Sequence, residues 1–437
     1  MSTRQSLLAT GRIASFVLLI FIVASSMYAT TPTERVIYKF QGMPDGASPQ
    51  GGLVADAAGN LYGTVPFGRL GAGMVFELSP PAIAGNPWIE TDLDDFGSVA
   101  NDGNFPSGTL IFDKLGNLYG TTEAGGVNNA GTVFELSPPA TTGGAWTETI
   151  LSPLAPKGAD GSKPTGKLVM DTKGNLYGTT SAGGNNRCAL HGCGTVFELA
   201  APTISGTAWK LKVIYNFAAT NDGATPAGDL LLRNGVLYGT TTLGGAANCG
   251  TVFKLTSKPG LWTETILYNF TASTDGANPN GGLISDSSGI LFGTTVGTSV
   301  FCSENCTGTI YEISPPATAG DPWVETTLHN FVNPGDGKNP YGALWRDSLG
   351  NLYGTTLLGG KGTSNIGTVF KLKAPATAGA PWTFVVLHYF RGVAIGDGAN
   401  PYSGLAFFNG KLYGTTISGG ATYTQTRTGG TVYSVIP

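Results

Sequence analysis

Short hydrophobic runs recur along the whole chain, separated by segments rich in glycine, proline, aspartate and asparagine. One group of four such runs covers 107–113, 117–122, 131–137 and 145–151. Valine, leucine, phenylalanine, tyrosine and threonine in runs of this length predict β-strands, and the polar segments between them predict tight turns. The pattern is therefore that of short strands joined by turns.

The group of four strands is one unit of a repeat. Each unit carries the sequence Leu-(Tyr/Phe)-Gly-Thr, which begins at Leu61, Leu118, Leu176, Leu237, Leu291, Leu352 and Leu412. Four short antiparallel strands per unit, repeated seven times, predict an all-β fold, a seven-bladed β-propeller of four-stranded antiparallel blades. We expect one domain, residues 30–437, with blades at about 45–96, 102–154, 160–217, 222–270, 275–331, 336–390 and 397–437, the last completed by 34–40.

The two ends of the repeat are out of phase. Residues 34–40 match the fourth-strand run 212–217, whereas the chain finishes on a third-strand run, 430–436. A ring in which the first segment completes the last blade leaves no broken blade and no unpaired edge there. We therefore expect residues 35–40 to pair beside 431–436 and close the ring.

The N-terminus differs from the repeat. Arg4 and Arg12 precede an apolar run, 13–27, of about the length of a secretory h-region. This pattern predicts that residues 1–29 are a signal peptide, cleaved after Ser26 or Ala29. The alternative is an uncleaved N-terminal anchor. In both cases we expect export, so that the protein is secreted or lies in the cell envelope.

The repeated sequence Leu-Tyr-Gly-Thr-Thr, followed by Gly-Gly and then by Gly-Thr-Val-Phe, carries a resemblance. It resembles the GloVer tandem repeat of bacterial exported proteins called choice-of-anchor tandem repeat GloVer-containing. The resemblance covers nearly the whole mature chain and implies export, often a C-terminal sorting anchor, and no catalytic activity. This chain stops at Pro437, at the end of a predicted strand, so we expect it to be released or held only by its N-terminus.

The net charge of the chain limits the classes of partner that we expect. The net charge is −4 and there is no run of lysine or arginine, so we expect no nucleic-acid partner. We expect a monomer that meets a membrane only through an uncleaved N-terminal segment.

Two close cysteine pairs in an exported chain predict local disulfides, Cys188–Cys193 and Cys302–Cys306. Zinc is the alternative, but the nearby His191 does not complete four ligands. Cys249 is left either buried or as a free thiol.

A second sequence, Asp-Gly-x-x-Pro, also occurs in every unit. Its aspartates are Asp45, Asp102, Asp160, Asp222, Asp275, Asp336 and Asp397. The favoured interpretation is a structural loop between blades, in which the carboxylate accepts backbone N–H groups as an Asx turn. The alternative is calcium, but a calcium site needs several oxygen ligands and most of these loops bring one carboxylate. We therefore expect no cofactor and no metal.

Aromatic residues follow the repeat as well. Six tryptophans open the fourth strands, which favours packing between blades over sugar stacking. They are Trp88, Trp146, Trp209, Trp262, Trp323 and Trp382. Trp345 is out of phase. His329 and His388 take the place of Tyr215 and Tyr268 in other units, so we expect packed rings rather than bases.

Function is expected where the units differ. The loops between second and third strands vary most, and we expect them to share one face of the disc with the Asp-Gly loops. We call this the variable-loop face. Its candidate ligand-binding residues are Arg187, His191, Lys361, Tyr423 and Arg427, near Asn128, Asn129 and Asn185. Such groups suit a glycan or a protein segment. The alternative is that they are ordinary solvated loop tips.

No catalytic motif is present, so the sequence assigns no catalytic residue and favours a binding or cell-surface scaffold over an enzyme. The alternative is an extracellular polysaccharide lyase or hydrolase that uses the central channel. A third hypothesis is a purely structural envelope component. An enzyme would place clustered carboxylates or histidines with shifted pKa values at the channel mouth, whereas a scaffold would place backbone and neutral polar groups there.

Overall fold

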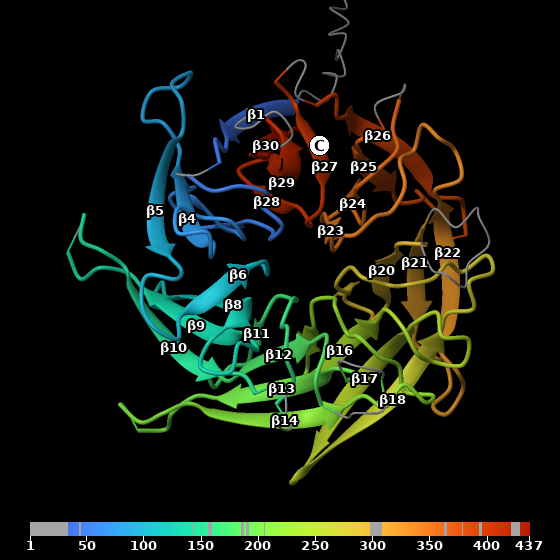
Figure 1. The fold of residues 1–437 in the computed structure, drawn as a ribbon. Helices are drawn as coiled ribbons and strands as arrows, with labels where there is room; N and C mark the ends of the chain where they lie inside the picture. Colours follow the sequence, from blue (N-terminus) through green and yellow to red (C-terminus); the bar gives the residue numbers. More distant parts are fainter. Residues whose placement is uncertain are drawn as a thin grey trace, which may run out of the picture. The chain divides into compact units, whose positions relative to one another are not determined.

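A computed structural model describes residues 34–437 except 43–44, 142, 156–159, 185–187, 189–191, 205, 298–307, 362–364, 378, 393–395 and 421–428. Residues Pro32–Pro437 form one compact unit. In this unit seven antiparallel sheets are arranged as a ring, which confirms the predicted seven-bladed β-propeller (Figure 1). Within the described ranges, no helix is long and apolar enough to cross a membrane.

Each blade has four strands, counted outward from the centre of the ring (Figure 1). The first strands are β2 (Val54–Ala55), β7 (Ile111–Phe112), β11 (Val169–Met170), β15 (Leu231–Arg233), β19 (Ile284–Ser285), β23 (Trp345–Arg346) and β28 (Ala406–Phe408). The second strands are β3 (Leu61–Val65), β8 (Leu118–Gly125), β12 (Leu176–Thr180), β16 (Val236–Thr241), β20 (Leu291–Thr295), β24 (Leu352–Thr356) and β29 (Lys411–Gly419). The third strands are β4 (Met74–Ser79), β9 (Thr132–Ser137), β13 (Thr195–Ala200), β17 (Thr251–Lys258), β21 (Thr309–Ser314), β25 (Thr368–Lys373) and β30 (Thr431–Val435). The fourth strands are β5 (Ile89–Asp95), β10 (Thr147–Pro153), β14 (Lys210–Asn216), β18 (Leu261–Asn269), β22 (Val324–Asn330), β26 (Thr383–Tyr389) and β1 (Glu34–Lys39). In two blades part of the Asp-Gly segment is also a strand, β6 (Gly103–Pro106) and β27 (Gly398–Pro401).

The ring closes as predicted. β1 pairs antiparallel with β30, from Glu34 opposite Val435 to Lys39 opposite Thr431. The next residue, Phe40, donates its backbone N–H to the Gly430 carbonyl oxygen at 3.1 Å and is fully buried. The N-terminal segment of the ring therefore supplies the fourth strand of the seventh blade.

The first strands are shorter than the sequence predicts. The run 107–113 reads as one strand, but only Ile111–Phe112 pair with β8. The preceding Gly108 is packed against the next blade instead, because a Cβ there would lie 3.2 Å from the Gly166 carbonyl oxygen. The inner half of each first segment therefore lies against a neighbouring blade rather than in its own ladder.

The repeated Gly-Thr-Thr sequence has a packing role. A Cβ on Gly178 would lie 2.5 Å from Phe197 Cζ and 2.8 Å from Leu168 Cδ2, so only glycine leaves room for these side chains. The second threonine pairs with the threonine that opens the third strand, as in Thr180 Oγ1 to Thr195 Oγ1 at 2.8 Å. The same pair is present in five further blades, at 122–132, 241–251, 295–309, 356–368 and 416–431.

The hydrophobic core is divided among the junctions between blades. The described residues form seven buried clusters, and each cluster joins two neighbouring blades. At the junction of the first two blades, for example, Phe96 packs edge-to-face on Phe134 with ring centroids 5.1 Å apart. Tryptophans cover these clusters: Trp146 packs on Tyr62 of the preceding blade at 6.2 Å. Trp88, Trp209, Trp262 and Trp382 make the same kind of contact, which confirms the expected packing between blades.

Candidate functional site

The segments that follow the Asp-Gly-x-x-Pro prolines line the centre of the ring. All seven blades contribute to one polar opening there, through residues 50–52, 107–109, 165, 227–229, 280–282, 341–343 and 402–404. In these segments each leucine that comes four residues after the proline is buried, while the residues before it face the channel or the next blade. The central channel is thus a surface to which every unit contributes and at which the side chains vary from unit to unit.

Close backbone contacts hold these segments together. A Cβ on Gly51 would lie 2.8 Å from the Gly108 carbonyl oxygen of the next blade. Thr64 Oγ1 donates to the same Gly108 oxygen at 3.2 Å, and Thr415 Oγ1 donates to the Gly51 oxygen at 3.2 Å. Glycine and a small hydroxyl therefore let neighbouring blades approach at the channel wall.

The channel contains two connected cavities. The smaller, about 80 Å³, lies where the chain enters the first strands from the Asp-Gly loops. The larger, about 580 Å³, extends along the first strands toward their other end. Because Gly52, Thr109, Asp229, Ala343 and Gly404 line both cavities, the channel is continuous. A volume of about 580 Å³ falls in the range of small-molecule sites.

The narrow mouth has aromatic and mostly neutral polar groups, together with the carboxylate of Asp229, which lines both cavities. Tyr341 and Tyr402 stack with ring centroids 4.9 Å apart and an angle of 21° between the rings. Burial, together with Tyr341 and the carboxylate of Glu123, raises the pKa of Tyr402 to about 12, so its hydroxyl remains a hydrogen-bond donor at neutral pH. The Ser107 hydroxyl donates to Glu123 Oε1 at 2.6 Å. Gln50, Thr165 and Asn280 complete this rim.

Most residues that line the larger cavity are apolar, but almost half of the surface that they expose to it is polar. Trp345, out of phase in the sequence, is one of them, and it stacks on Phe407 of the next blade with ring centroids 4.5 Å apart. Among the described lining residues, Lys167 and Asp229 are the ones with charged side chains. Asp229 Oδ1 accepts the backbone N–H of Lys167 at 2.7 Å, which fixes this carboxylate against the wall. The cavity therefore offers a mixed apolar and polar surface with two charged side chains.

Most of the candidate residues on the variable-loop face lie outside the described residues. These are Arg187, His191, Tyr423 and Arg427, together with Asn185 and the cysteines 302 and 306. Lys361 is described and exposed. Cys188 and Cys193 form a disulfide. Cys249 is buried, and its thiol donates to the Ala247 carbonyl oxygen.

Asparagines of the variable loops maintain the loop shape. Asn129 has a positive φ of 51°, and its Oδ1 accepts the Gly125 N–H at 3.0 Å. Asn128 donates from Nδ2 to the Leu154 carbonyl oxygen at 3.0 Å. Asn248 repeats the Asn129 turn in another blade, and Asn365, which also has a positive φ, accepts the Gly359 N–H at 2.8 Å. The side-chain amides of Asn128 and Asn129 therefore have hydrogen-bond partners within their own blade.

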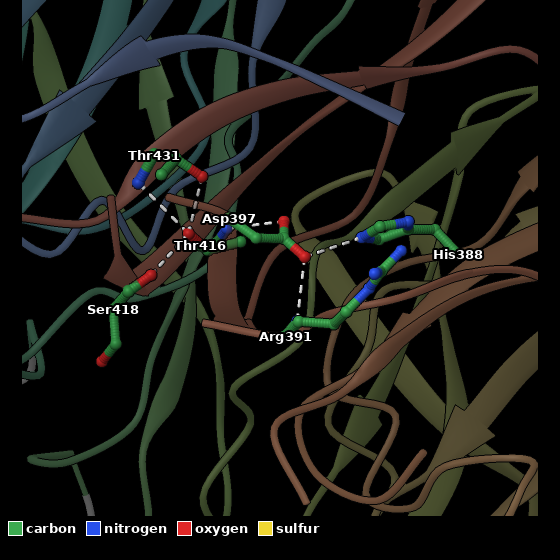
Figure 2. A network of polar contacts seen from close by, with 7 residues as sticks. His388, Arg391, Asp397, Thr416, Ser418 and Thr431 are labelled. Atoms are coloured by element: carbon green, nitrogen blue, oxygen red, sulfur yellow. Dashed lines mark hydrogen bonds and ion pairs between the residues drawn. The ribbon is translucent and has the colours of Figure 1, made fainter. Parts of the chain in front are cut away.

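The Asp-Gly aspartates bind the blades to one another. Asp222 Oδ2 accepts the Tyr215 hydroxyl at 3.1 Å and the Ala218 N–H at 2.9 Å. In two other loops a histidine replaces the tyrosine: His388 Nε2 lies 3.2 Å from Asp397 Oδ2, and His329 Nε2 lies 3.1 Å from Asp336 Oδ2 (Figure 2 shows the Asp397 network). These histidines occupy the tyrosine position, as the sequence suggests.

A third group completes each of these junctions. We call such a group of three residues a junction triad. Its first member lies in the fourth strand of one blade, its second is the Asp-Gly aspartate that follows, and its third is the residue of the next blade's fourth strand that approaches them. In the triad Tyr215–Asp222–Glu264, burial first and then Asp222 raise the pKa of Glu264 to about 8. In Asp94–Asp102–Glu148, burial raises the pKa of Glu148 to about 8 and that of Asp94 to about 7. These strongly shifted carboxylates lie on the outer strands, not in the channel.

Glu264→Gln should raise the free energy of unfolding at pH 9 by about 1 kcal/mol, a value reduced for solvent screening of a half-buried group, and change it little at pH 5. The pKa of Glu264 rises from 4.5 to about 8 on folding, so the folded chain retains a proton that the unfolded chain releases. The stability that the protonated Glu264 gives to the wild type is complete below pH 4.5 and is lost as the pH rises to about 8. Urea unfolding at both pH values measures this effect.

The matched variant is Glu264→Leu, because Leu211 stands at this position in the preceding blade. It should show the same gain at pH 9. A difference between wild type and Glu264→Gln that does not depend on pH would contradict the desolvation of this carboxylate.

Sequence reasoning missed the channel residues Lys167, Asp229, Tyr341 and Tyr402. A signal was present, because the first residue after each Asp-Gly-x-x-Pro proline varies among Gln, Ser, Thr, Ala, Asn and Tyr. The leucine three residues further on is the same in all seven units. A position that varies among the units beside a leucine that does not vary indicates side chains that the packing of the blades does not require.

Comparison with known proteins gives the family and adds no activity. No curated protein is similar to the chain in sequence. Among solved structures, a puromycin-hydrolysing peptidase from Mycobacterium tuberculosis is 12% identical with a TM-score of 0.49, and the match covers 91% of this chain. This chain spans 56% of the length of that peptidase. A protein of unknown function from Dyadobacter fermentans is 12% identical with a TM-score of 0.44, and the match covers 93% of this chain and 98% of that one.

The repeat matches a known family. The Gloeobacter/Verrucomicrobia repeat matches residues 22–208, 147–331 and 296–437, which together span the ring. The chain therefore belongs to the Gloeobacter/Verrucomicrobia repeat family, as the resemblance of its repeated sequence predicts.

Proposed function

We propose that this protein is an exported binding scaffold that recognises a glycan or a protein segment on the variable-loop face, around the narrow mouth of the channel. The observation that carries the proposal is the stacked pair Tyr341 and Tyr402 in a rim of amides and hydroxyls. Aromatic faces beside neutral hydrogen-bonding groups suit sugar rings and peptide backbones. The candidate residues Arg187, His191, Lys361, Tyr423 and Arg427 are proposed as further contacts with the same ligand.

The alternative, a polysaccharide lyase or hydrolase, has less support from the channel. A glycoside hydrolase needs two carboxylates on either side of the scissile bond. The larger cavity offers Asp229 and Lys167, and Asp229 is already bonded to the backbone of Lys167. The carboxylates with the largest pKa shifts belong to the junction triads on the outer strands. This distribution is the one expected of a scaffold.

Tyr402→Ala should abolish saturable binding on a glycan and polysaccharide array probed with the full chain. The loss follows because the substitution removes one face of the aromatic pair at the narrow mouth. Phe407→Ala is the matched control, since Phe407 is an exposed aromatic residue of the same blade and stacks on Trp345 in the larger cavity. It should leave glycan binding unchanged.

A combined Arg187→Ala, Tyr423→Ala and Arg427→Ala variant tests the surrounding loops and should weaken the same binding. If no glycan binds, a peptide library replaces the array and the same variants apply. Binding that survives Tyr402→Ala and the loop variant would move the site away from this face. Turnover of any polysaccharide by the wild type would favour the enzyme.

A further inference from the structure

The junction triad at the ring closure differs in chemistry from the others. It consists of His388 at the end of β26, Asp397 before β27, and Glu34 at the start of β1, and we call it the closure triad. One ligand atom from each of these side chains lies within 4.8 Å of the other two. Among the described residues, this is the group where three histidine, cysteine or carboxylate ligand atoms converge in this way.

Two members of the closure triad are firmly positioned. Asp397 Oδ1 accepts the Gly398 N–H at 2.7 Å, and Oδ2 accepts the Arg391 N–H at 2.8 Å (Figure 2). His388 Nε2 lies 3.2 Å from Asp397 Oδ2, and the two side chains are 12% and 6% exposed. Hydrogen bonds that fix a carboxylate in this manner are the usual support around a metal ligand.

The third member, Glu34, is less well satisfied by hydrogen bonds. Glu34 Oε1 is buried and has no hydrogen-bond partner in the structure, and the same is true of Glu148 Oε1 and Glu264 Oε1 in the two other junction triads. Unlike those two, Glu34 lies beside a histidine and an aspartate whose ligand atoms converge with its own. A buried carboxylate oxygen without a partner is costly, and such groups in folded proteins are usually hydrogen-bonded, paired or bound to a metal. A cation between Glu34, His388 and Asp397 would satisfy this oxygen and offset the repulsion between the two carboxylates.

The neighbouring junction provides an internal comparison. It has the same histidine and aspartate, with His329 Nε2 lying 3.1 Å from Asp336 Oδ2. At the position of Glu34, however, it has Phe384, which stacks on His329 with ring centroids 4.0 Å apart. There an aromatic ring fills the space, and one of the three ligands is missing.

We propose that the closure triad is a binding site for a divalent transition-metal ion of the Zn²⁺ type. Imidazole nitrogen and carboxylate oxygen are both zinc ligands, and three protein ligands with a water in the fourth position form a common arrangement. Ligand atoms around zinc lie about 3.3 Å apart, so the Glu34 carboxylate must move inward by up to about 1.5 Å on binding. The ion would join β1 to His388 and Asp397 and so stabilise the ring where it closes.

The test is the thermal midpoint of the full chain, first stripped with EDTA and then titrated with ZnSO₄. We expect Zn²⁺ to raise the midpoint of the wild type and calorimetry to give one site. Co²⁺ should give the visible absorption of a tetrahedral or five-coordinate ion. His388→Tyr should weaken binding more than about tenfold and remove the shift. Tyrosine stands at this position in other triads, as in Tyr215–Asp222–Glu264, so this variant should fold.

His329→Tyr is the matched control, and it should keep the Zn²⁺ shift because its junction lacks the third ligand. Glu34→Gln should lose most of the shift. No shift in the wild type would overturn the proposal, and so would a shift that survives both His388→Tyr and Glu34→Gln. An equal response to Ca²⁺ that His388→Tyr leaves intact would place the ion at the Asp-Gly loops instead, and would also overturn it.

Arg391 provides a further readout. Its guanidinium is a positive charge that acts on Glu34 and competes with any ion at the closure triad. Arg391→Ala should therefore tighten Zn²⁺ binding, whereas a purely structural role of the triad predicts no change in metal affinity.

Discussion

Phe40→Ala should lower the free energy of unfolding by about 3–5 kcal/mol, the usual cost of deleting a buried aromatic ring. Phe40 is fully buried and packs edge-to-face on Phe76 of the first blade, with ring centroids 5.1 Å apart. Phe40 directly follows β1, which pairs with the rest of the seventh blade through its ladder with β30. The substitution therefore weakens both the core and the closure. Urea denaturation measures the loss of stability.

Phe217→Ala is the matched control for this prediction. Phe217 occupies the same position in another blade, is fully buried, and packs on Phe253 at 5.2 Å. It should cost about as much free energy, yet only Phe40→Ala should speed hydrogen exchange of the β30 amides, because only there does the weakened strand end the ring. Equal exchange of β30 in both variants would show that closure is not the point where the ring opens.

Gly178→Ala should destabilise the protein by about 1–3 kcal/mol, the typical cost of forcing an extra carbon into a packed core. The new Cβ would lie 2.5 Å from Phe197 Cζ and 2.8 Å from Leu168 Cδ2, so both side chains must move. Gly178 has no positive φ, and the cost is therefore one of packing rather than of backbone strain. Differential scanning calorimetry measures the shift.

Gly335→Ala is the control for this substitution. A Cβ there would have Asn333 Oδ1 as its nearest neighbour, at 3.6 Å, and its φ is not positive. The variant should be neutral or slightly more stable, because alanine restricts the unfolded chain. A wild-type melting temperature for Gly178→Ala would contradict the packing role of Gly-Thr-Thr.

The repeat made the fold predictable from the sequence, whereas the channel chemistry could not be predicted. Seven copies of one strand pattern, with residues 34–40 out of phase, were enough to give the blade number and the closing pair. Tyr341 and Tyr402 come from different units, and their stacking depends on how close neighbouring first segments approach across glycine. That distance is set by packing, which strand patterns do not contain.

The closure triad shows a second limit. The sequence predicts that β1 lies beside β30, and it predicts His388 as a packed ring in place of tyrosine. Bringing Glu34 to His388 also requires the register, in which Glu34 stands opposite Val435, and the direction of its side chain toward the neighbouring blade. A shift of the register by one residue would turn Glu34 to the other face of the sheet.

The pairing of Glu34 with Val435 also bears on how such a ring arises and how it can be rearranged. The two ends of the propeller are neighbours in one ladder, so the place where the polypeptide starts is not a property of the ring. Joining these ends and cutting any Asp-Gly loop would give a circular permutant with the same contacts. In evolutionary terms, a gene duplication could begin at any point within a unit and still yield a closed propeller. The offset of one strand between sequence units and blades would be the trace of that freedom.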